Sequence, residues 1–194
     1  MAAAALLLIA APIWLVVAIG IKASDPGPVF YVARRSGLRG AIFPMFKFRT
    51  MRIGSDRHSR IAAAKDSRVF PFGTLLRRLK LDELPQLINI IRGEMAFVGP
   101  RPEDPWIVER FYSNLDRQTL EVLPGLTSPG SLYYVAEAEQ ALASVDTEAA
   151  YVNGPLRTKL DLDRAYIHKA SAGSDLRVIL QTALVLLRLS SYSR

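Results

Sequence analysis

The chain begins with an uninterrupted apolar run and continues as a mixture of short apolar stretches and polar segments. Residues 2–21 read AAAALLLIAAPIWLVVAIGI and contain no charged side chain. A helix needs about 20 such residues to cross the hydrocarbon core of a bilayer. The pattern therefore predicts a membrane-embedded helix over residues 1–22 and a polar domain over residues 23–194.

Three arrangements compete for this first helix. A cleaved signal peptide normally begins with basic residues, and this start has none, which disfavours it. A straight spanning helix and a helix that bends and returns remain open, because a proline such as Pro12 also occurs in spanning helices. The residues alone favour spanning. The cations that follow (Lys22, Arg34, Arg35 and Arg39) predict a cytoplasmic polar domain under either geometry.

Alternating apolar and aromatic residues predict a β-hairpin at the start of the polar domain. The turn sequence DPGP precedes one apolar stretch, and Gly37 and Gly40 separate it from a second stretch rich in aromatics. We expect strands at residues 29–32 and 43–48. Residues 52–68 are polar, and we expect a loop there with some helix.

Two short helices are predicted next, on either side of an acidic pair. Thr74 is placed to cap a helix over residues 75–80. A second helix is expected over residues 83–92, where Leu84, Leu87, Ile88 and Ile91 fall on one face. Because Pro85 is tolerated only in a first turn, Asp82 should lie at or near the N-cap of this helix.

The remaining pattern is mainly helical. A rigid proline-containing loop is expected at residues 95–105, and a turn-rich loop at 123–130. Helices are predicted over residues 106–121, 134–150, 155–169 and 175–189, the last as a core helix or one lying at a membrane interface. The fold class is therefore α+β and mostly helical, with a membrane-embedded helix and a small domain that contains a β-hairpin.

Charge is distributed unevenly along the chain. The net charge is +7, but residues 22–101 carry 16 Lys/Arg against 6 Asp/Glu, and residues 102–194 carry 9 against 12. A basic half indicates an anionic partner such as nucleic acid, a phosphorylated small molecule or an acidic membrane surface. The absence of cysteine excludes disulfides and thiolate metal sites, and the two histidines, His58 and His168, lack zinc-ligand spacing.

The acidic pair Asp82–Glu83 is the candidate for chemistry. A helix start attracts carboxylates and phosphates alike, and Arg77 and Arg78 add positive charge nearby. A hard divalent ion such as Mg²⁺ would suit an oxygen-only site shared with a phosphate, and a carboxylate can also attack phosphorus. On spacing alone, however, a simpler interpretation is favoured, with Asp82 as a plain N-cap and Glu83 as a first-turn partner of the helix dipole.

Several sequence blocks together resemble the bacterial sugar transferase family, the monotopic phosphoglycosyl transferases. These are DPGPVFYVARRSGLRGAIFPMFKFRTM, LLRRLKLDELPQLINIIRGEMAFVGPRP, LPGLT, LDRAYI and SAGSDLRVIL, in this order. The resemblance implies an enzyme that moves a sugar-1-phosphate from a UDP-sugar to a polyprenyl (undecaprenyl) phosphate at the start of surface-glycan assembly. It implies that Asp82 is the nucleophile, which forms a covalent phosphosugar, and that Glu83, with Asp82, binds Mg²⁺.

The resemblance also assigns other residues and a location. Basic residues that face phosphate are Lys47, Arg49 and Arg77, the nucleotide loop is Pro100–Arg101–Pro102, and Asp163 and Asp175 match acidic positions of a later motif. The family's first helix is re-entrant, with both ends at the cytoplasmic face of the bacterial inner membrane. Its bend is a Ser-Pro pair, for which this chain has Ala11–Pro12.

Two other functions compete with this one. A membrane-tethered nucleic-acid-binding protein would use the basic half and the aromatics of residues 43–48 as a stacking strand, but the cations are interleaved with prolines rather than set in a stripe. A catalytically silent scaffold is disfavoured by the intact Asp82–Glu83 pair. We therefore expect a UDP-sugar, a polyprenyl phosphate and the lipid bilayer as partners, and no nucleic acid; the sequence leaves a homodimer and the identity of the sugar open.

Overall fold

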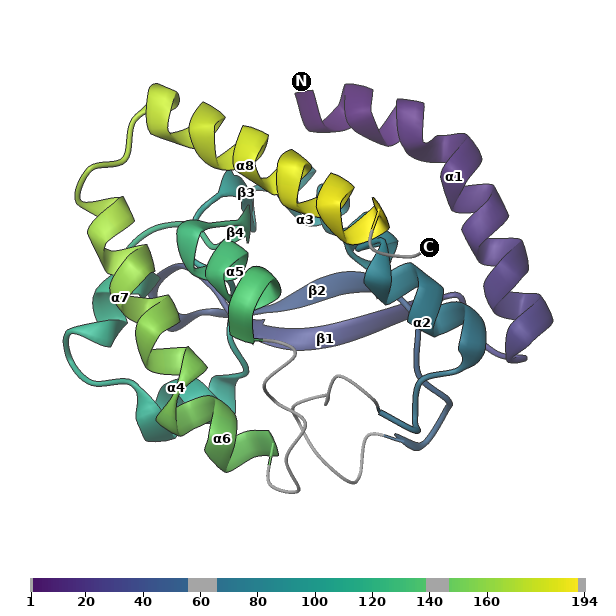
Figure 1. The fold of residues 1–194 in the computed structure, drawn as a ribbon, viewed down its shortest axis with the longest axis horizontal. Coiled ribbons are helices and arrows are strands. Elements are labelled where there is room, and N and C mark those ends of the chain that lie inside the picture. The colour runs from purple at the N-terminus through teal and green to yellow at the C-terminus, as the bar shows by residue number, and fades with distance from the viewer. Residues whose placement is uncertain (1, 56–65, 139–146, 192–194) are drawn as a thin grey trace.

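The computed structural model describes residues 2–55, 66–138 and 147–191, and it has the predicted mostly helical α+β fold with an N-terminal apolar helix and a β-hairpin (Figure 1). The helices are α1 Ala2–Ser24, α2 Pro71–Arg78, α3 Gln86–Ile91, α4 Pro105–Phe111, α5 Pro129–Tyr133, α6 Thr147–Asn153, α7 Pro155–Ile167 and α8 Ala172–Ser191. The strands are β1 Phe30–Ser36, β2 Ile42–Phe48, β3 Ala96–Val98 and β4 Gly125–Thr127. Short 3₁₀ helices are η1 Leu38–Gly40, η3 Leu81–Glu83 and η4 Asp116–Leu120, and η5 Tyr134–Ala138 is a short π-helix.

Helix α1 is continuous, contains Pro12 and bends part-way along its length (Figure 1). Among the described residues, Ala3–Ser24 is the one helix that is long and apolar enough to cross a membrane. Its C-terminal half packs on the domain, where Val17 and Ile21 join a buried cluster. The other buried members of this cluster are Phe48, Phe70 and Leu76.

The β-hairpin is confirmed, with a first strand that continues to Ser36. Strands β1 and β2 pair in antiparallel register, with Val32 opposite Phe46. The tip closes through a hydrogen bond from Gly37 N to Ala41 O of 2.7 Å, and Gly40 has a φ of 76° that favours glycine. One face of β2 is buried, so the hairpin forms a wall on which other elements pack.

The two helices beside the acidic pair differ from the prediction. Helix α2 begins at Pro71 because proline fits a first helical turn, so Thr74 lies inside the helix and is not its cap. The predicted helix over 83–92 is a 3₁₀ turn followed by α3, whose N-cap is Pro85 and not Asp82. Pro85 has no N–H to donate to a regular helical turn. The backbone before it forms hydrogen bonds that span three residues in place of four, such as the bond from Leu84 N to Leu81 O.

The buried face of α3 is also not the predicted apolar stripe. Leu87 is buried, but Ile91 is 51% exposed and Asn89 is completely buried. The Asn89 side chain accepts a hydrogen bond from Phe46 N (3.0 Å) and donates one to Pro44 O (2.7 Å). These bonds fix α3 to β2 and turn the helix so that a polar residue points inward.

Two segments that were predicted to be loops contain short strands, β3 and β4. β3 and β4 pair in parallel, with Ala96 opposite Gly125 and Val98 opposite Thr127. Pairing of segments so distant in sequence leaves little local pattern, and glycine permits it here: a Cβ on Gly125 would lie 2.1 Å from Gly99 N. The pairing places the loop that follows β3 beside the loop that precedes α5.

The predicted helix over 106–121 is interrupted. Helix α4, capped by a hydrogen bond from Trp106 N to Asp104 (2.9 Å), ends at Phe111. The carboxylate of Asp116 then accepts hydrogen bonds from Ser113 N and Oγ, which forms a turn in place of helix. The chain continues as the short η4 segment.

The remaining predicted helices are confirmed in part. α7 and α8 occur where expected, and α8 is longer than predicted. The predicted helix over 134–150 is a π-turn at its start and α6 at its end, with residues 139–146 outside the described part. Residues 56–65, which hold His58 and most of the predicted loop over 52–68, also lie outside it.

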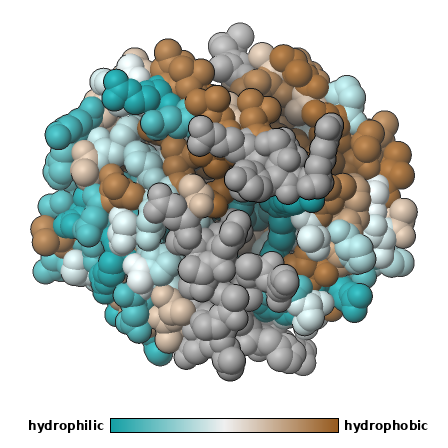
Figure 2. All heavy atoms as spheres, viewed as in Figure 1, coloured by the Kyte–Doolittle hydropathy of each residue, from teal (hydrophilic) through white to brown (hydrophobic). Residues whose placement is uncertain are grey.

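A second buried cluster holds the C-terminal half together. It joins α4, α6 and α7, and its buried members are Ile107, Val108, Tyr112, Tyr151, Val152, Leu156 and Leu160. Helix α8 lies across the top of the molecule in this view, on the same side as the N-terminal part of α1 (Figure 1). Figure 2 shows hydrophobic residues gathered along this side of the molecule.

Candidate active site

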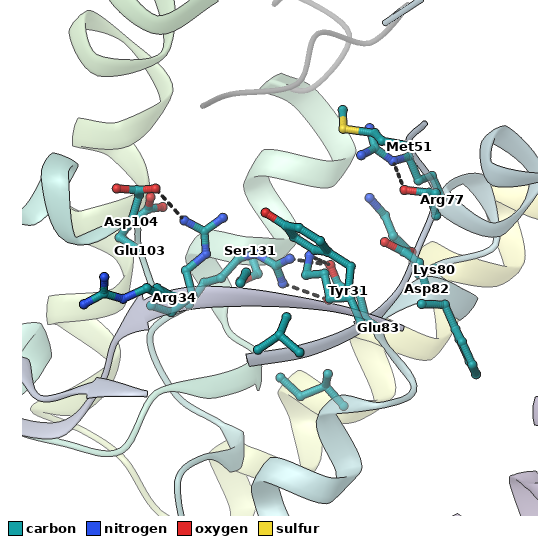
Figure 3. A pocket seen from close by; sticks show the side chains of 18 of the residues that line it. Tyr31, Arg34, Met51, Arg77, Lys80, Asp82, Glu83, Glu103, Asp104 and Ser131 are labelled. Carbon is teal, nitrogen blue, oxygen red and sulfur yellow. Dashed lines mark hydrogen bonds and ion pairs between the residues drawn. The ribbon is translucent and has the colours of Figure 1, made fainter. Parts of the chain in front are cut away.

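A cavity of about 1390 Å³ lies between the hairpin, η3, the loop after β3 and the α5–α7 region. Its lining brings together most of the predicted site residues: Lys47, Arg49, Arg77, Asp82, Glu83 and Arg101. Asp82 and Lys80 lie toward one side of the cavity and Glu103 and Asp104 toward the other, with Tyr31 between them (Figure 3). Pro100, Pro102 and Asp163 are not part of the lining in the described portion of the chain.

Asp82 is held by an unusual backbone turn. Lys80 has a φ of 53°, a left-handed conformation that is uncommon for a residue with a side chain and is found often at functional sites. This turn starts η3 and leaves Asp82 only 7% exposed. Burial raises the pKa of Asp82, and the charge of Lys47 opposes this effect. Within the described residues, the Asp82 carboxylate accepts no hydrogen bond and forms no ion pair.

Glu83, the next residue, is in the opposite situation. Arg101 contacts both carboxylate oxygens, with Nη1 donating to Oε2 at 2.9 Å and Nη2 to Oε1, and Lys47 Nζ donates to Oε1 at 3.3 Å. Burial alone would raise the pKa of Glu83, but Arg101 and Lys47 hold it well below its usual range. Glu83 is therefore an anion fixed by two cations.

In the described part of the chain, the pair combines one carboxylate without a partner, Asp82, and one that is paired with two cations, Glu83. Neighbouring carboxyl groups in different environments can take different chemical roles. An ionised carboxylate that is not engaged by a cation is the form that can attack phosphorus, and Lys47, Arg77 and Arg101 give the cavity wall positive charge suited to a phosphorylated ligand. The described residues hold no group of three or more potential ligands that would bind a metal alone. Mg²⁺ commonly uses one or two carboxylates together with substrate phosphates. Asp82 offers a carboxylate for such a site, and Glu83 would share its oxygens between the ion and its contacts with Arg101 and Lys47.

A sequence model of the bacterial sugar transferase family matches residues 1–189. The chain belongs to this family. The match covers every element that builds the cavity, from the end of α1 through the hairpin and η3 to α7. The prediction made from the ordered sequence blocks is thereby confirmed.

Named relatives support the assignment. A UDP-glucose:undecaprenyl-phosphate glucose-1-phosphate transferase of Xanthomonas campestris is 37% identical over 177 residues, which are 89% of this chain and 34% of the relative. A protein of the same name in Caulobacter vibrioides is 35% identical over 191 residues, 96% of this chain and 67% of the relative. The exopolysaccharide production protein ExoY of Rhizobium meliloti is 35% identical, covering 94% of this chain and 80% of the relative. The chain spans about a third of the length of the Xanthomonas protein.

Two of the predicted basic residues of this sugar transferase make structural contacts. Arg77 Nε donates to Thr50 Oγ1 at 2.8 Å, which fixes its guanidinium at the cavity edge. Arg49 is 5% exposed and donates to Pro28 O (2.7 Å) and to the backbone and side chain of Asp25. Arg49 thus joins the end of α1 to the hairpin while it lines the cavity.

Asp163 and the two prolines lie behind the cavity wall. Asp163 Oδ1 accepts a hydrogen bond from Gly130 N at 2.8 Å at the start of α5. Burial raises the pKa of Asp163 to about 6, although the hydrogen bond from Gly130 opposes this shift. Pro100 O accepts a hydrogen bond from Gly125 N (2.9 Å), so Pro100 fixes the loop that carries Arg101. Asp175, at the start of α8, accepts a hydrogen bond from the Tyr166 hydroxyl.

Sequence reasoning missed a second group of polar residues on the cavity wall. Glu103, Tyr151 and Lys159 are all buried and bonded to one another. A local indication was present: in α7, Lys159 and Asp163 fall on the same face as the buried Leu156 and Leu160. A charged residue on an otherwise apolar helix face indicates a buried partner.

The nucleic-acid interpretation is disfavoured by the position of the aromatics on β2. Phe43 is 8% exposed and Phe48 1% exposed, so both rings belong to buried clusters. Phe46 lies under the guanidinium of Arg92. A strand that stacks bases needs exposed ring faces, which these residues do not offer.

Proposed function

We propose that this sugar transferase moves a sugar-1-phosphate from a UDP-sugar to undecaprenyl phosphate and releases UMP. The names of the Xanthomonas and Caulobacter relatives describe this reaction for glucose. The observation that carries the proposal is the pairing difference at the cavity wall: Glu83 is held by Arg101 and Lys47, whereas Asp82 has no partner among the residues that the structure describes. The name of the Rhizobium relative supports a role in exopolysaccharide production.

In the first step, an oxygen of ionised Asp82 attacks the sugar-bearing β-phosphorus of the UDP-sugar. A bond forms between this oxygen and phosphorus, and the bond from phosphorus to the bridging oxygen breaks. UMP leaves with that oxygen and its electron pair, and an aspartyl phosphosugar remains. Arg77, Lys47 and Arg101 stabilise the negative charge that develops on the leaving phosphate.

In the second step, a phosphate oxygen of the polyprenyl phosphate attacks the same phosphorus. The bond between phosphorus and Asp82 breaks, and the carboxylate is regenerated. The bond between the sugar and its phosphate oxygen stays intact throughout. Burial of Asp82 lowers its solvation, which raises its reactivity once it is ionised.

We also propose Mg²⁺ as the cofactor, held by Glu83 and Asp82 together with the diphosphate. The ion supplies positive charge that lets carboxylates and phosphates share one site. Arg101 and Lys47 keep Glu83 ionised and oriented, and an ionised carboxylate is the form that binds a hard cation.

Membrane association places the lipid acceptor near the cavity in this proposal. Helix α8 exposes Leu176, Ile179, Leu180, Leu184 and Leu187, and α1 exposes Leu6, Leu8, Ile9, Ile13, Leu15, Val16 and Ile19. Helices α1 and α8 lie on the same side of the molecule, where apolar residues gather (Figure 2). The bend in α1 supports a re-entrant helix with both ends at the cytoplasmic face of the inner membrane.

The decisive experiment separates the two steps. Purified enzyme with a UDP-sugar and Mg²⁺ but no lipid should release about one UMP per active site, as covalent catalysis requires. Intact-mass and peptide analysis should then find one added sugar phosphate on the peptide that contains Asp82. Addition of undecaprenyl phosphate should remove this adduct and restore turnover.

Two variants complete the test. Asp82→Asn keeps the size of the side chain but lacks the nucleophilic oxygen, so UMP release and adduct should both disappear while the thermal unfolding midpoint is retained. Glu83→Gln should slow the reaction and weaken its Mg²⁺ dependence, but the adduct should stay on Asp82. UMP release that requires lipid, with no adduct trapped under any condition, would refute the covalent mechanism.

A further inference from the structure

A buried network of three polar side chains forms the wall of the cavity opposite Asp82. Glu103 follows the Arg101 loop, Tyr151 belongs to α6 and Lys159 to α7. The Tyr151 hydroxyl donates to Glu103 Oε1 at 2.5 Å, and Lys159 Nζ donates to Glu103 Oε1 and, at 2.7 Å, to the Tyr151 oxygen. All three side chains line the cavity although each residue is at most 9% exposed.

The network leaves one strong acceptor unused. Both hydrogen bonds to the Glu103 carboxylate end on Oε1, and among the described residues Oε2 accepts none. Burial alone would raise the pKa of Glu103, but Lys159 lowers it, so the carboxylate is ionised. The Glu103 side chain is nine-tenths buried on the cavity wall, and a ligand that donates a hydrogen bond to Oε2 would stabilise its charge.

The carboxylate is also rigid. Its own backbone carbonyl accepts a hydrogen bond from Ser36 N of 2.9 Å at the end of β1. Tyr151 and Lys159 fix the side chain from α6 and α7, and the Lys159 ammonium lies 5.4 Å from the centre of the Tyr151 ring. A preorganised acceptor of this kind binds a hydroxyl group without losing side-chain conformational entropy on binding.

The position of Glu103 suits one part of the proposed substrate. Glu103 is two residues from Arg101, which contacts Glu83 beside the nucleophile. The cavity is continuous from Asp82 to this wall (Figure 3). The hydrogen-bond donors of a sugar nucleotide are mainly its ring hydroxyls, whereas its ionised phosphates only accept hydrogen bonds and would be repelled by a carboxylate.

We propose that Glu103, positioned by Tyr151 and Lys159, accepts a hydrogen bond from a ring hydroxyl of the sugar nucleotide and thereby determines substrate selectivity. The hydroxyl belongs either to the transferred sugar or to the ribose, which share this chemistry. The inference rests on the proposed function, because it takes a sugar nucleotide as the ligand. Glu103 acts as a specificity residue, and Tyr151 and Lys159 act as positioning residues.

The test uses variants that keep the buried charges balanced. Glu103→Gln alone would leave the buried Lys159 ammonium without its anionic partner. The main variant is therefore Glu103→Gln combined with Lys159→Met. Tyr151→Phe is a second, milder change. The kcat/KM values of UDP-sugars that differ at one hydroxyl are compared for parent and variants. The affinities of UMP and 2′-deoxy-UMP are compared by the shift in the thermal unfolding midpoint, which needs no turnover. A lost hydrogen bond to a charged acceptor should reduce one of these discrimination ratios by roughly 10- to 100-fold.

The outcome assigns the hydroxyl or rejects the proposal. A change in the ratio between UDP-sugars assigns the transferred sugar, and a change in the ratio between UMP and 2′-deoxy-UMP assigns the ribose. Both ratios unchanged in an active, folded variant would overturn the inference and leave the network a purely structural one. Failure of the parent to release UMP from any UDP-sugar would instead reject the proposed function itself.

A matched control is available on the same helix. Arg157 of α7 pairs with the buried Asp116 at 2.8 Å, and neither residue lines the described cavity. The variant Asp116→Asn with Arg157→Met removes a second ion pair between α7 and a loop. It should alter the unfolding midpoint but leave both discrimination ratios at the parent values.

Discussion

Arg101 and Glu83 form a two-point ion pair on the cavity wall. The planar guanidinium contacts both oxygens of the carboxylate, with Nη1 donating to Oε2 at 2.9 Å. The two residues come from different parts of the fold, η3 and the loop after β3, so the pair also joins these segments. Its geometry is specific to arginine, because lysine offers a single point charge.

Replacement of Arg101 by lysine should therefore impair turnover although the charge is kept. The variant loses the two-point contact with Glu83, and we expect kcat/KM for the UDP-sugar to fall at least about tenfold. Steady-state UMP release measures this directly. Arg117→Lys is the control, since the Arg117 guanidinium donates to Val108 O (3.3 Å) and neither residue is part of the described cavity lining. Parental activity of Arg101→Lys would show that this loop does not act through bidentate recognition.

Asp163 should make stability depend on pH in a predictable direction. Its pKa is raised to about 6 by burial, so the folded state favours the protonated form. The stabilisation is fully present below the unfolded-state pKa of about 4 and is lost as the pH rises through about 6. Asp163→Asn keeps an acceptor for Gly130 N and cannot ionise.

The measurement is the unfolding free energy of parent and Asp163→Asn between pH 4 and pH 7. The difference between the two proteins should change by about 2 kcal/mol over this range, with the parent losing stability relative to the variant as the pH rises. A difference that stays constant with pH would contradict the buried, protonated state. The KM for the UDP-sugar should also stay near the parent value if Asp163 acts behind the wall; a large rise would favour the direct substrate contact predicted from the sequence.

The orientation of α1 can be tested with single cysteines because the chain has none of its own. Ala4→Cys should react with a membrane-impermeant thiol reagent only from the cytoplasmic side if the helix is re-entrant. Adding Pro12→Leu removes the cause of the bend and should shift labelling toward the periplasmic side. Lys169→Cys provides the cytoplasmic reference. Periplasmic labelling of Ala4→Cys with Pro12 intact would exclude the re-entrant arrangement.

The close approach of β3 and β4 should be intolerant of a single methyl group. In Gly125→Ala, the new Cβ would lie 2.1 Å from Gly99 N, so one strand must move. We expect a loss of about 1–3 kcal/mol in unfolding free energy, together with slower turnover because the Arg101 loop follows β3. Gly173→Ala in α8 is the control, since its nearest atom, Ser171 Oγ, lies 3.9 Å away. Its stability should be unchanged or slightly increased.

Local periodicity accounts for the parts of the fold that the sequence predicts well. The hairpin and α7 have regular patterns of two and about 3.6 residues, and their own turns and prolines define their ends. The end of α4 and the start of α2 were misplaced because one side-chain bond, at Asp116, and one proline, at Pro71, outweigh propensity. The β3–β4 pair was missed because its stability comes from a contact between distant segments.

The sequence likewise indicated some residues of the candidate site but not the contacts between them. The adjacent carboxylates and their cations occur in one short stretch, so Asp82, Glu83 and Arg77 could be named from the sequence. The sequence could not show which of the two carboxylates forms an ion pair. That depends on Arg101, which belongs to a different segment of the chain and contacts Glu83 only in the folded protein. The Glu103–Lys159 contact joins residues 56 positions apart, and only their burial reveals it.

The packing of α1 has a practical consequence for work with this enzyme. Val17 and Ile21 supply part of the buried cluster that contains Phe48, Phe70 and Leu76, and Gly20 lies so close to the Phe72 ring that a Cβ there would be 2.4 Å from it. Deletion of the first helix would leave these aromatic and aliphatic side chains facing water. We therefore expect that removal of α1 would not give a soluble, active form. Such a form should need a replacement helix that keeps the inward face of α1 and changes only the outward face to polar residues.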